Sequence, residues 1–273
     1  MSDPIIVSAA TGVASGLATV WSMEAVAWIK SYFNDHHPSA VQKAQKNTSD
    51  FLIELSNRVM QLESKGVELK NVLEDPEFSS ALQKAVIASS ETESKEKHQL
   101  LAEVLANRLK SEAESRQALL AKMSLNIIPF LTPKQIELLS LIALFHNIQP
   151  VNLSEPMNYQ IWIIHTYFPY LDIEIDNKDI LYLESLACVK TEDIRLKVGG
   201  FPHHYDPFLR SKLEEKNPNV DLDPSFYETS EFQKLEKLWI EHIHLVQPTS
   251  VGSFIAINTL NLKEGSPIPL TNF

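Results

Sequence analysis

The chain has 273 residues, 44% of them hydrophobic and 22% charged, so it can bury the core of one large or two modest domains. Its 24 basic and 35 acidic residues give a net charge of −11, which argues against broad binding to nucleic-acid backbones. Only 7 glycines and a single cysteine predict a mainly α-helical chain without internal disulfides. We interpret that cysteine, Cys188, as a small buried side chain.

The N-terminal segment is uncharged over 20 consecutive residues, from Pro4 to Met23. As a helix with a rise of about 1.5 Å per residue it would be about 30 Å long, which is the thickness of a hydrocarbon core. Trp21 and Trp28 lie near one end, and Lys30 is the first basic residue. A signal peptide is disfavoured because no basic residue precedes the apolar run. We therefore predict one membrane-spanning helix within residues 1–30, with a buried core helix as the alternative.

Hydroxyl side chains in this segment share one helical face. They fall within an arc of about 80° on a helical wheel, and two glycines spaced four apart flank the arc. Such a stripe either packs closely against other copies or lines a pore, and a single span can do either only in a homo-oligomer. The predicted pore or oligomer seam consists of Ser8, Thr11, Gly12, Ser15, Gly16, Thr19 and Ser22.

Residues 31–72 are predicted to form a helical stalk or linker. Leucine and valine side chains repeat there with 3-4-3 spacing at Leu52, Leu55, Val59 and Leu62. This short repeat either extends the oligomer axis or packs in the ordinary way against the domain that follows.

A helical bundle is predicted for residues 73–130 and a further helical domain for residues 131–273. Asp75 and Pro76 are typical of a helix start, and so are Thr132 and Pro133. In the second domain, "DILYLESLACVKTEDI" predicts a helix that runs into a short strand. "QPTSVGSFIAINTLNL" predicts a strand or turn that leads into a last helix.

Motifs that carry catalytic chemistry were not found in the sequence. It contains no nucleophile elbow, no His-Glu-x-x-His pair and no phosphate-binding glycine loop. The histidine pairs lack the i,i+3 or i,i+4 spacing by which two helical residues share a metal ion. We therefore expect no enzyme activity, no cofactor and no metal ion.

Several segments between residues 73 and 262 resemble the Abi-alpha type of bacterial abortive-infection proteins. They are "DPEFSSALQKAVIAS", "LLAEVLANRL", "LTPKQIELLSLIALF", "LYLESLACVKT" and "VQPTSVGSFIAINTL", in that order. The resemblance implies a role in phage defence and a winged-helix-like C-terminal part, and it transfers no catalytic residue. The segment between Val189 and Leu245 is longer than a simple wing. Residues 177–189 contain a single basic residue, Lys178, so we interpret this part as a protein-contact module and not as a DNA reader.

A membrane span in front of such a body also resembles defence effectors of the Hailong type, in which a nucleotidyltransferase partner and its nucleic-acid product control an oligomeric channel. The expected function is a non-enzymatic antiviral-defence effector. It would form a homo-oligomeric, ion-conducting pore in the bacterial inner membrane, with its body in the cytoplasm. The alternative is a soluble helical adaptor or regulator that binds a partner protein or an oligonucleotide signal. Candidate signal contacts are Lys190, Arg195, Lys197, Arg210 and Lys212.

Overall fold

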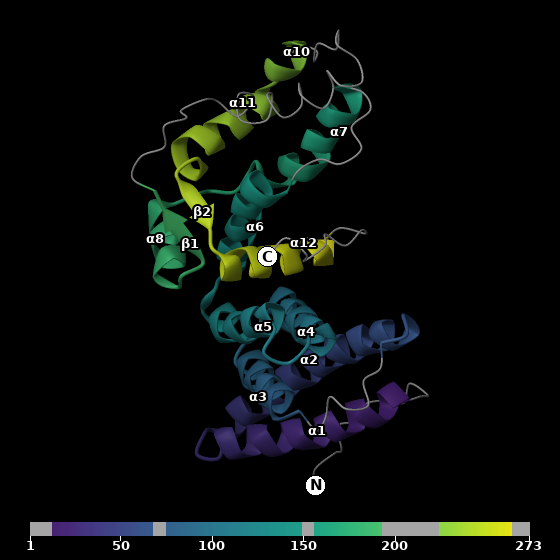
Figure 1. Ribbon diagram of the computed structural model, residues 1–273. Helices are drawn as coiled ribbons and strands as arrows, with labels where there is room; N and C mark the ends of the chain where they lie inside the picture. Colours follow the sequence, from purple (N-terminus) through teal and green to yellow (C-terminus); the bar gives the residue numbers. More distant parts are fainter. Residues whose placement is uncertain (1–12, 68–74, 149–155, 193–223, 264–273) are drawn as a thin grey trace. The chain divides into compact units, whose positions relative to one another are not determined.

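The computed structural model describes residues 13–67, 75–148, 156–192 and 224–263, which are mainly helical, as predicted (Figure 1). The chain divides into two compact units. Unit 1 is Met1–Pro133 together with Ile257–Phe273, and unit 2 is Lys134–Ala256. Unit 1 thus includes the described parts of the predicted segments 1–30, 31–72 and 73–130, because the apolar faces of its first helices pack on one another.

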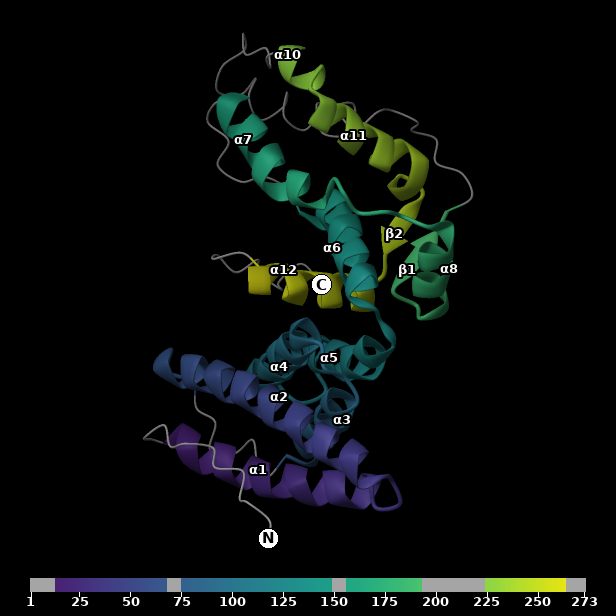
Figure 2. The same cartoon turned by 180° about the vertical axis from the view of Figure 1, so that it is seen from behind.

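Unit 1 is a layered arrangement of helices, visible from both sides in Figures 1 and 2. Helix α1 lies along α2, and α2 packs on α3 and α4. The core between them is filled by large side chains such as Phe51, Phe78 and Leu100, all of which are fully buried. The elements are α1 (Val13–Tyr32), α2 (Pro38–Ser64), α3 (Pro76–Ser90), α4 (Lys95–Lys110), α5 (Arg116–Ile127), the 3₁₀ turn η2 (Ile128–Phe130) and the end of α12 (Ser250–Lys263).

Helices α2 and α4 run parallel, with residues 45 positions apart facing each other. Gln99 Nε2 donates to Glu54 Oε1 at 3.5 Å, and one turn later Arg58 Nε lies 3.2 Å from Glu103 Oε2. The leucine and valine repeat of α2 is buried in this unit at Leu52, Leu55, Val59 and Leu62. The repeat therefore packs in the ordinary way, which was one of the two interpretations of its spacing.

Both ends of α3 are held by side-chain hydrogen bonds, from its own N-cap residue and from other helices. At its start, Asp75 Oδ1 accepts from the amide of Glu77 at 2.9 Å, and the buried Arg108 guanidinium lies 2.8 Å from Asp75 Oδ2. At its end, His98 Nε2 lies 3.2 Å from the Ser89 carbonyl oxygen, and Asn47 Nδ2 donates to the Ser90 carbonyl at 3.1 Å. A carbonyl can only accept, so Nε2 of His98 carries the proton. These bonds satisfy carbonyls that a helix end leaves without an intrahelical partner.

The end of α12 is tied to α4 by a buried amide pair. Asn107 Nδ2 donates to Asn258 Oδ1, and both side chains are buried. Because buried amides are costly unless they are hydrogen-bonded, this pair fixes which turn of α12 faces α4.

Unit 2 combines helices with a two-stranded antiparallel sheet. An aromatic cluster holds its helices together: the Phe145 ring stacks on Trp239 with centroids 5.2 Å apart, and Tyr167 lies 4.8 Å from Phe145. The elements are α6 (Pro133–Asn147), α7 (Pro156–Tyr167), η3 (Phe168–Tyr170), α8 (Asn177–Ser185), β1 (Val189–Thr191), α10 (Pro224–Tyr227), α11 (Ser230–Leu238), the π-helical turn η4 (Trp239–Ile243), β2 (Val246–Pro248) and the start of α12.

Strands β1 and β2 bring together segments that lie far apart in the sequence. Val189 pairs with Pro248, and Thr191 pairs with Val246. Directly after β2, the Thr249 hydroxyl oxygen lies 2.6 Å from the Ala187 carbonyl oxygen and accepts from the amide of Gly252 at 3.1 Å. The predicted helix-to-strand and strand-to-helix transitions are thus confirmed, and one threonine joins them.

A prediction concerns the junction of α6 with α8. Asp179 accepts from Lys134 Nζ at 2.9 Å and from Gln135 Nε2 at 3.1 Å. Burial acts to raise the pKa of Asp179, but the hydrogen bonds from Lys134 and Gln135 outweigh it and hold the pKa below its ordinary value. The resulting stabilisation is present above the unfolded pKa of about 3.9 and is lost as pH falls through the lower folded pKa.

We therefore expect Asp179→Asn to lower the free energy of unfolding slightly at pH 7, by less than about 1 kcal/mol, and the effect to shrink as pH falls through the lowered folded pKa. The measurement is urea unfolding over a pH series. An effect of the same size at both ends of the series would mean that the charge of Asp179 does not stabilise this junction.

Candidate functional site

All seven residues of the predicted seam lie beyond the part of the chain whose side chains are described. Ser8, Thr11 and Gly12 are outside the described residues. Ser15, Gly16, Thr19 and Ser22 belong to the backbone of α1, but their side chains are also outside the described part. The assignment of these seven residues to a seam therefore stays a prediction.

The described part of α1 is a helix with one buried face. Trp21, Ala25 and Ile29, spaced four residues apart, are fully buried in unit 1, and Trp21 packs on Phe78 of α3 with ring centroids 5.8 Å apart. The indole N–H of Trp21 is buried as well and has no hydrogen-bond partner. In the structure Trp21 is therefore a core residue, whereas the sequence suggested a tryptophan at a membrane interface. Within the described ranges, no helix joins the length and apolar character that crossing a membrane requires.

The predicted signal contacts are described at one position only. Lys190 is exposed on β1, where it pairs with Gln247 of β2. Arg195, Lys197, Arg210 and Lys212 lie outside the described residues. Of the five predicted contacts, the structure therefore places only Lys190.

Helix α8 presents an outward face of a distinct kind. Ile180 and Leu183 are buried, whereas positions 178, 181, 182 and 185 are exposed. Leu181 is 62% exposed and Tyr182 is 39% exposed. Exposed residues at i, i+3, i+4 and i+7 are those with which a helix enters the groove of a partner protein. We call this set the α8 face: Lys178, Leu181, Tyr182 and Ser185.

Other side chains fix α8 and leave its outward face accessible. Asp176 Oδ1 accepts from the amide of Lys178 at 3.0 Å and so caps the helix start. Glu184 accepts from the amide of Thr191 at 2.9 Å and from its hydroxyl at 3.2 Å, which ties α8 to β1. The α8 face is therefore presented by a helix that is anchored at both ends.

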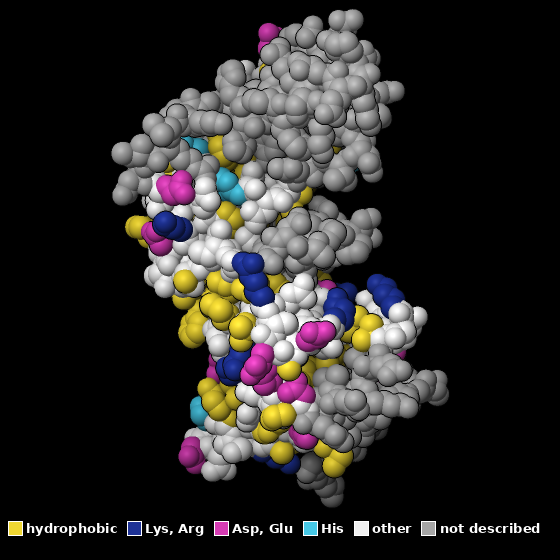
Figure 3. Space-filling model, viewed as in Figure 1, with side chains coloured by type: hydrophobic (Ala, Val, Ile, Leu, Met, Phe, Trp, Pro, Cys, Tyr) yellow, Lys and Arg dark blue, Asp and Glu magenta, His cyan; other side chains and the backbone are white. Residues whose placement is uncertain are grey.

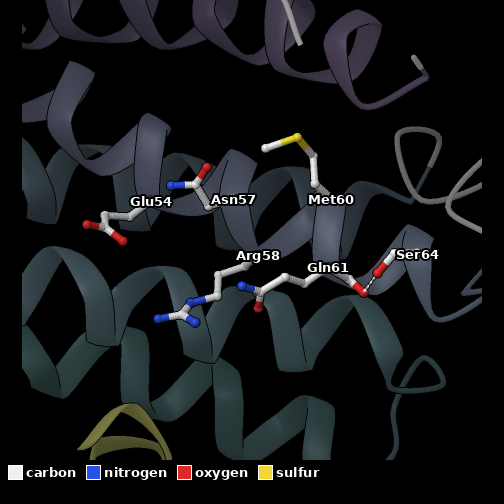
Figure 4. A pocket seen from close by; sticks show the side chains of 6 residues that line it. All are labelled: Glu54, Asn57, Arg58, Met60, Gln61 and Ser64. Carbon is white, nitrogen blue, oxygen red and sulfur yellow. Dashed lines mark hydrogen bonds between the residues drawn. The ribbon is translucent and has the colours of Figure 1, made fainter. Parts of the chain in front are cut away.

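A shallow depression of about 450 Å³ lies along α2 (Figure 4). In Figure 4, Arg58 and Gln61 extend to one side of α2 and Met60 to the opposite side. Arg58 forms an ion pair with Glu103 of α4, as described above. The described residues that line the depression are Glu54, Asn57, Arg58, Met60, Gln61 and Ser64.

Two lysines mark the shared end of α2 and α4. Lys65 follows α2, and Lys110 is the last residue of α4. Burial lowers the pKa of Lys110, Glu103 acts to raise it, and Lys65 lowers it further. Parallel helices place two negative dipole ends side by side, which favours cations there. We therefore interpret these lysines as stabilising the helix ends.

Cys188 and His37 have structural surroundings. Cys188 is fully buried, and burial raises the pKa of its thiol to about 11, so the thiol stays protonated at neutral pH. His37 Nδ1 accepts from the amide of Ser39 at 3.3 Å and caps α2, a role that the sequence analysis missed. Among the described residues, no group of three or more His, Cys, Asp or Glu side chains is placed to hold a metal ion.

These observations define a mainly helical protein of two units, in which α8 presents an exposed face with Leu181 and Tyr182. A family model matches residues 18–228, so the chain belongs to that family, whose function is unknown. No curated protein and no solved structure matches the chain.

Proposed function

We propose that the chain is a helical adaptor or regulator of bacterial antiviral defence, which acts by binding a partner protein. The observation that carries the proposal is the α8 face, where Leu181 is 62% exposed between Lys178 and Ser185. An exposed leucine flanked by polar groups on a rigid helix provides an apolar anchor with a polar rim, as protein interfaces require. The defence context rests on the resemblance to abortive-infection proteins.

The order of elements in unit 2 supports a contact role. Helix α8 leads into β1 and β2 leads into α12, and the long segment between the strands, which includes α10, α11 and η4, would take the place of a wing. The exposed face of α8 carries one cation, Lys178, together with two large hydrophobic residues. Reading DNA bases requires several Arg, Lys, Asn or Gln side chains in a groove, so a protein partner fits this face better.

The proposal is tested in cells that express the chain with its neighbouring genes. We expect Leu181→Asp to reduce protection against phage roughly tenfold or more, since truncating a central apolar anchor costs about 2 kcal/mol of binding. Ile53→Asp on α2 is the matched control, because Ile53 is also about half exposed but lies in unit 1. Equal protection by both variants and the unchanged chain, at equal protein levels, would refute a role for the α8 face.

A second candidate is the membrane effector, a homo-oligomeric pore gated by the helical body and controlled by a nucleotidyltransferase-like partner or its oligonucleotide product. The uncharged run from Pro4 to Met23 favours it. Membrane insertion of α1 would require Trp21, Ala25 and Ile29 to leave unit 1, where they are buried. Fractionation without detergent separates the candidates: recovery of the full chain in the soluble fraction supports the adaptor, and recovery only with membranes supports the effector.

A further inference from the structure

Helix α1 forms an outer layer of unit 1 and packs on α2 and α3 (Figures 1 and 2). Among its described side chains, those of Trp21, Ala25 and Ile29 are fully buried and form one line along the helix. The other described side chains of α1 are exposed or partly exposed, and Met23 is 70% exposed. The described part of α1 is therefore buried along a narrow face only.

The described polar groups of α1 add little to this attachment. The Tyr32 hydroxyl donates to Glu91 Oε1 at 3.0 Å, but both residues are exposed, so water competes for the hydrogen bond. The indole N–H of Trp21 is buried without a partner, which costs free energy that contact with water would remove. Detachment of α1 would therefore satisfy a donor that the docked helix leaves unpaired.

Helices α2, α3 and α4 are joined by contacts that do not involve α1. Arg58 of α2 forms an ion pair with Glu103 of α4 at 3.2 Å, and Asn47 of α2 donates to the Ser90 carbonyl at the end of α3. The buried guanidinium of Arg108 joins α4 to the start of α3. These three helices thus hold one another through interactions that would persist without α1.

The start of α2 is also fixed without α1. His37 Nδ1 accepts from the amide of Ser39 at 3.3 Å, and Pro38 is the first residue of the helix. Residues 33–37 connect α2 to α1, and the rings of Phe33 and His36 lie 4.9 Å apart in this connection. A change of backbone angles there would move α1 and leave the cap of α2 intact.

We propose that α1 is a detachable cover of unit 1, which leaves as one piece while α2, α3 and α4 stay folded. Elements with few buried contacts open at a lower free energy than the core to which they are attached. Opening would expose an apolar surface that includes Phe78, which is 1% exposed while Trp21 packs on it. On the face of unit 1 seen in Figure 3, charged side chains of both signs lie among hydrophobic and polar ones. The position of α1 would therefore decide whether unit 1 also presents an apolar surface.

The inference goes beyond the proposed function and does not depend on it, because it concerns unit 1 and not the α8 face. It also does not require α1 to enter a membrane, since the opening takes place in water.

The test is hydrogen exchange of the full chain by mass spectrometry, under conditions in which the exchange rate reports the opening equilibrium. Peptides that cover residues 21–32 report on α1. We expect Trp21→Ala to raise their exchange rate about a hundredfold or more, because the cover loses its largest buried side chain. Trp28→Ala is the matched control, since Trp28 lies on the same helix but is only partly buried, and it should change the rate by less than about fivefold.

A second variant separates opening of α1 from unfolding of the bundle. Leu100 is fully buried in α4, so Leu100→Ala should raise the exchange rate of peptides that cover residues 95–110 about thirtyfold or more. The same variant should leave the rate of the α1 peptides within about twofold of the unchanged chain, because opening of α1 does not pass through unfolding of α4.

Two outcomes would overturn the proposal. Equal acceleration of α1 and α4 by Leu100→Ala would show that both unfold in one step. An unchanged α1 rate in Trp21→Ala would show that its amides exchange without the helix leaving α2 and α3. If circular dichroism shows Leu100→Ala unfolded, exchange of the unchanged chain in rising urea below its unfolding transition replaces that arm. A rate in α1 that rises with urea as steeply as the rate in α4 would then overturn the proposal, because the slope reports the surface exposed.

Discussion

Replacing Trp21 with alanine is expected to destabilise unit 1 by about 3 to 5 kcal/mol, the usual cost of removing a fully buried tryptophan. Trp21 packs on Phe78, and Ala25 and Ile29 follow it on the same buried face of α1. The loss would leave a cavity between α1 and α3 and expose the ring of Phe78. Urea unfolding of the full chain, followed by circular dichroism, measures the effect.

Trp28 is the matched control for this prediction. It lies on the same helix and is only partly buried, so Trp28→Ala should cost less than about 1 kcal/mol. Trp21→Phe should retain most of the stability, because the phenyl ring still packs on Phe78 and the buried indole N–H has no partner to lose. If both alanine variants unfold like the unchanged chain, α1 is not part of the core, and the membrane effector becomes the better proposal.

Replacing Gly252 with alanine is expected to destabilise unit 2 by about 3 kcal/mol or more. A Cβ atom at this position would lie 1.8 Å from the carbonyl oxygen of Cys188, and that oxygen belongs to the backbone just before β1. The clash cannot be relieved by turning a side chain. It would push α12 away from β1 and break the bonds that Thr249 makes to Ala187 and Gly252.

Gly66→Ala is the control for Gly252→Ala. Gly66 has a positive φ of 82°, but a Cβ there meets no atom within 4 Å. The expected cost is therefore only that of a left-handed backbone, about 1 kcal/mol. Both costs are read from the urea midpoints of the two variants. Equal costs at the two glycines would show that the close approach of α12 to β1 does not limit the stability of unit 2.

Local helix signals were sufficient to place several element boundaries. Asp75 and Pro76 predicted the start of α3, and the structure confirms the cap of Asp75 on Glu77. Pro133 begins α6, as the Thr132 and Pro133 pair predicted. These signals are reliable because a cap acts on amides two or three residues away, so the sequence contains all of the groups involved.

Contacts between distant segments were not predictable in this way. The sequence contains Asp75, Glu77 and Arg108 without indicating that they meet, and only the packing of α4 on α3 brings the guanidinium to both carboxylates. The α8 face was missed for the same reason. Leu181 and Leu183 are the same residue type two positions apart. Which of them is exposed depends on the side of α8 that packs on the rest of unit 2.

The sequence by itself determined that this protein is mainly helical, where many of its helices begin, and that a strand or turn leads into the last helix, because these properties follow from interactions within a few residues. It did not determine whether the apolar stretch around Trp21 enters a membrane or a core, since both environments favour the same side chains. The tertiary structure decided that Trp21, Ala25 and Ile29 are buried, because α2 and α3 provide an apolar surface against which that face of α1 packs.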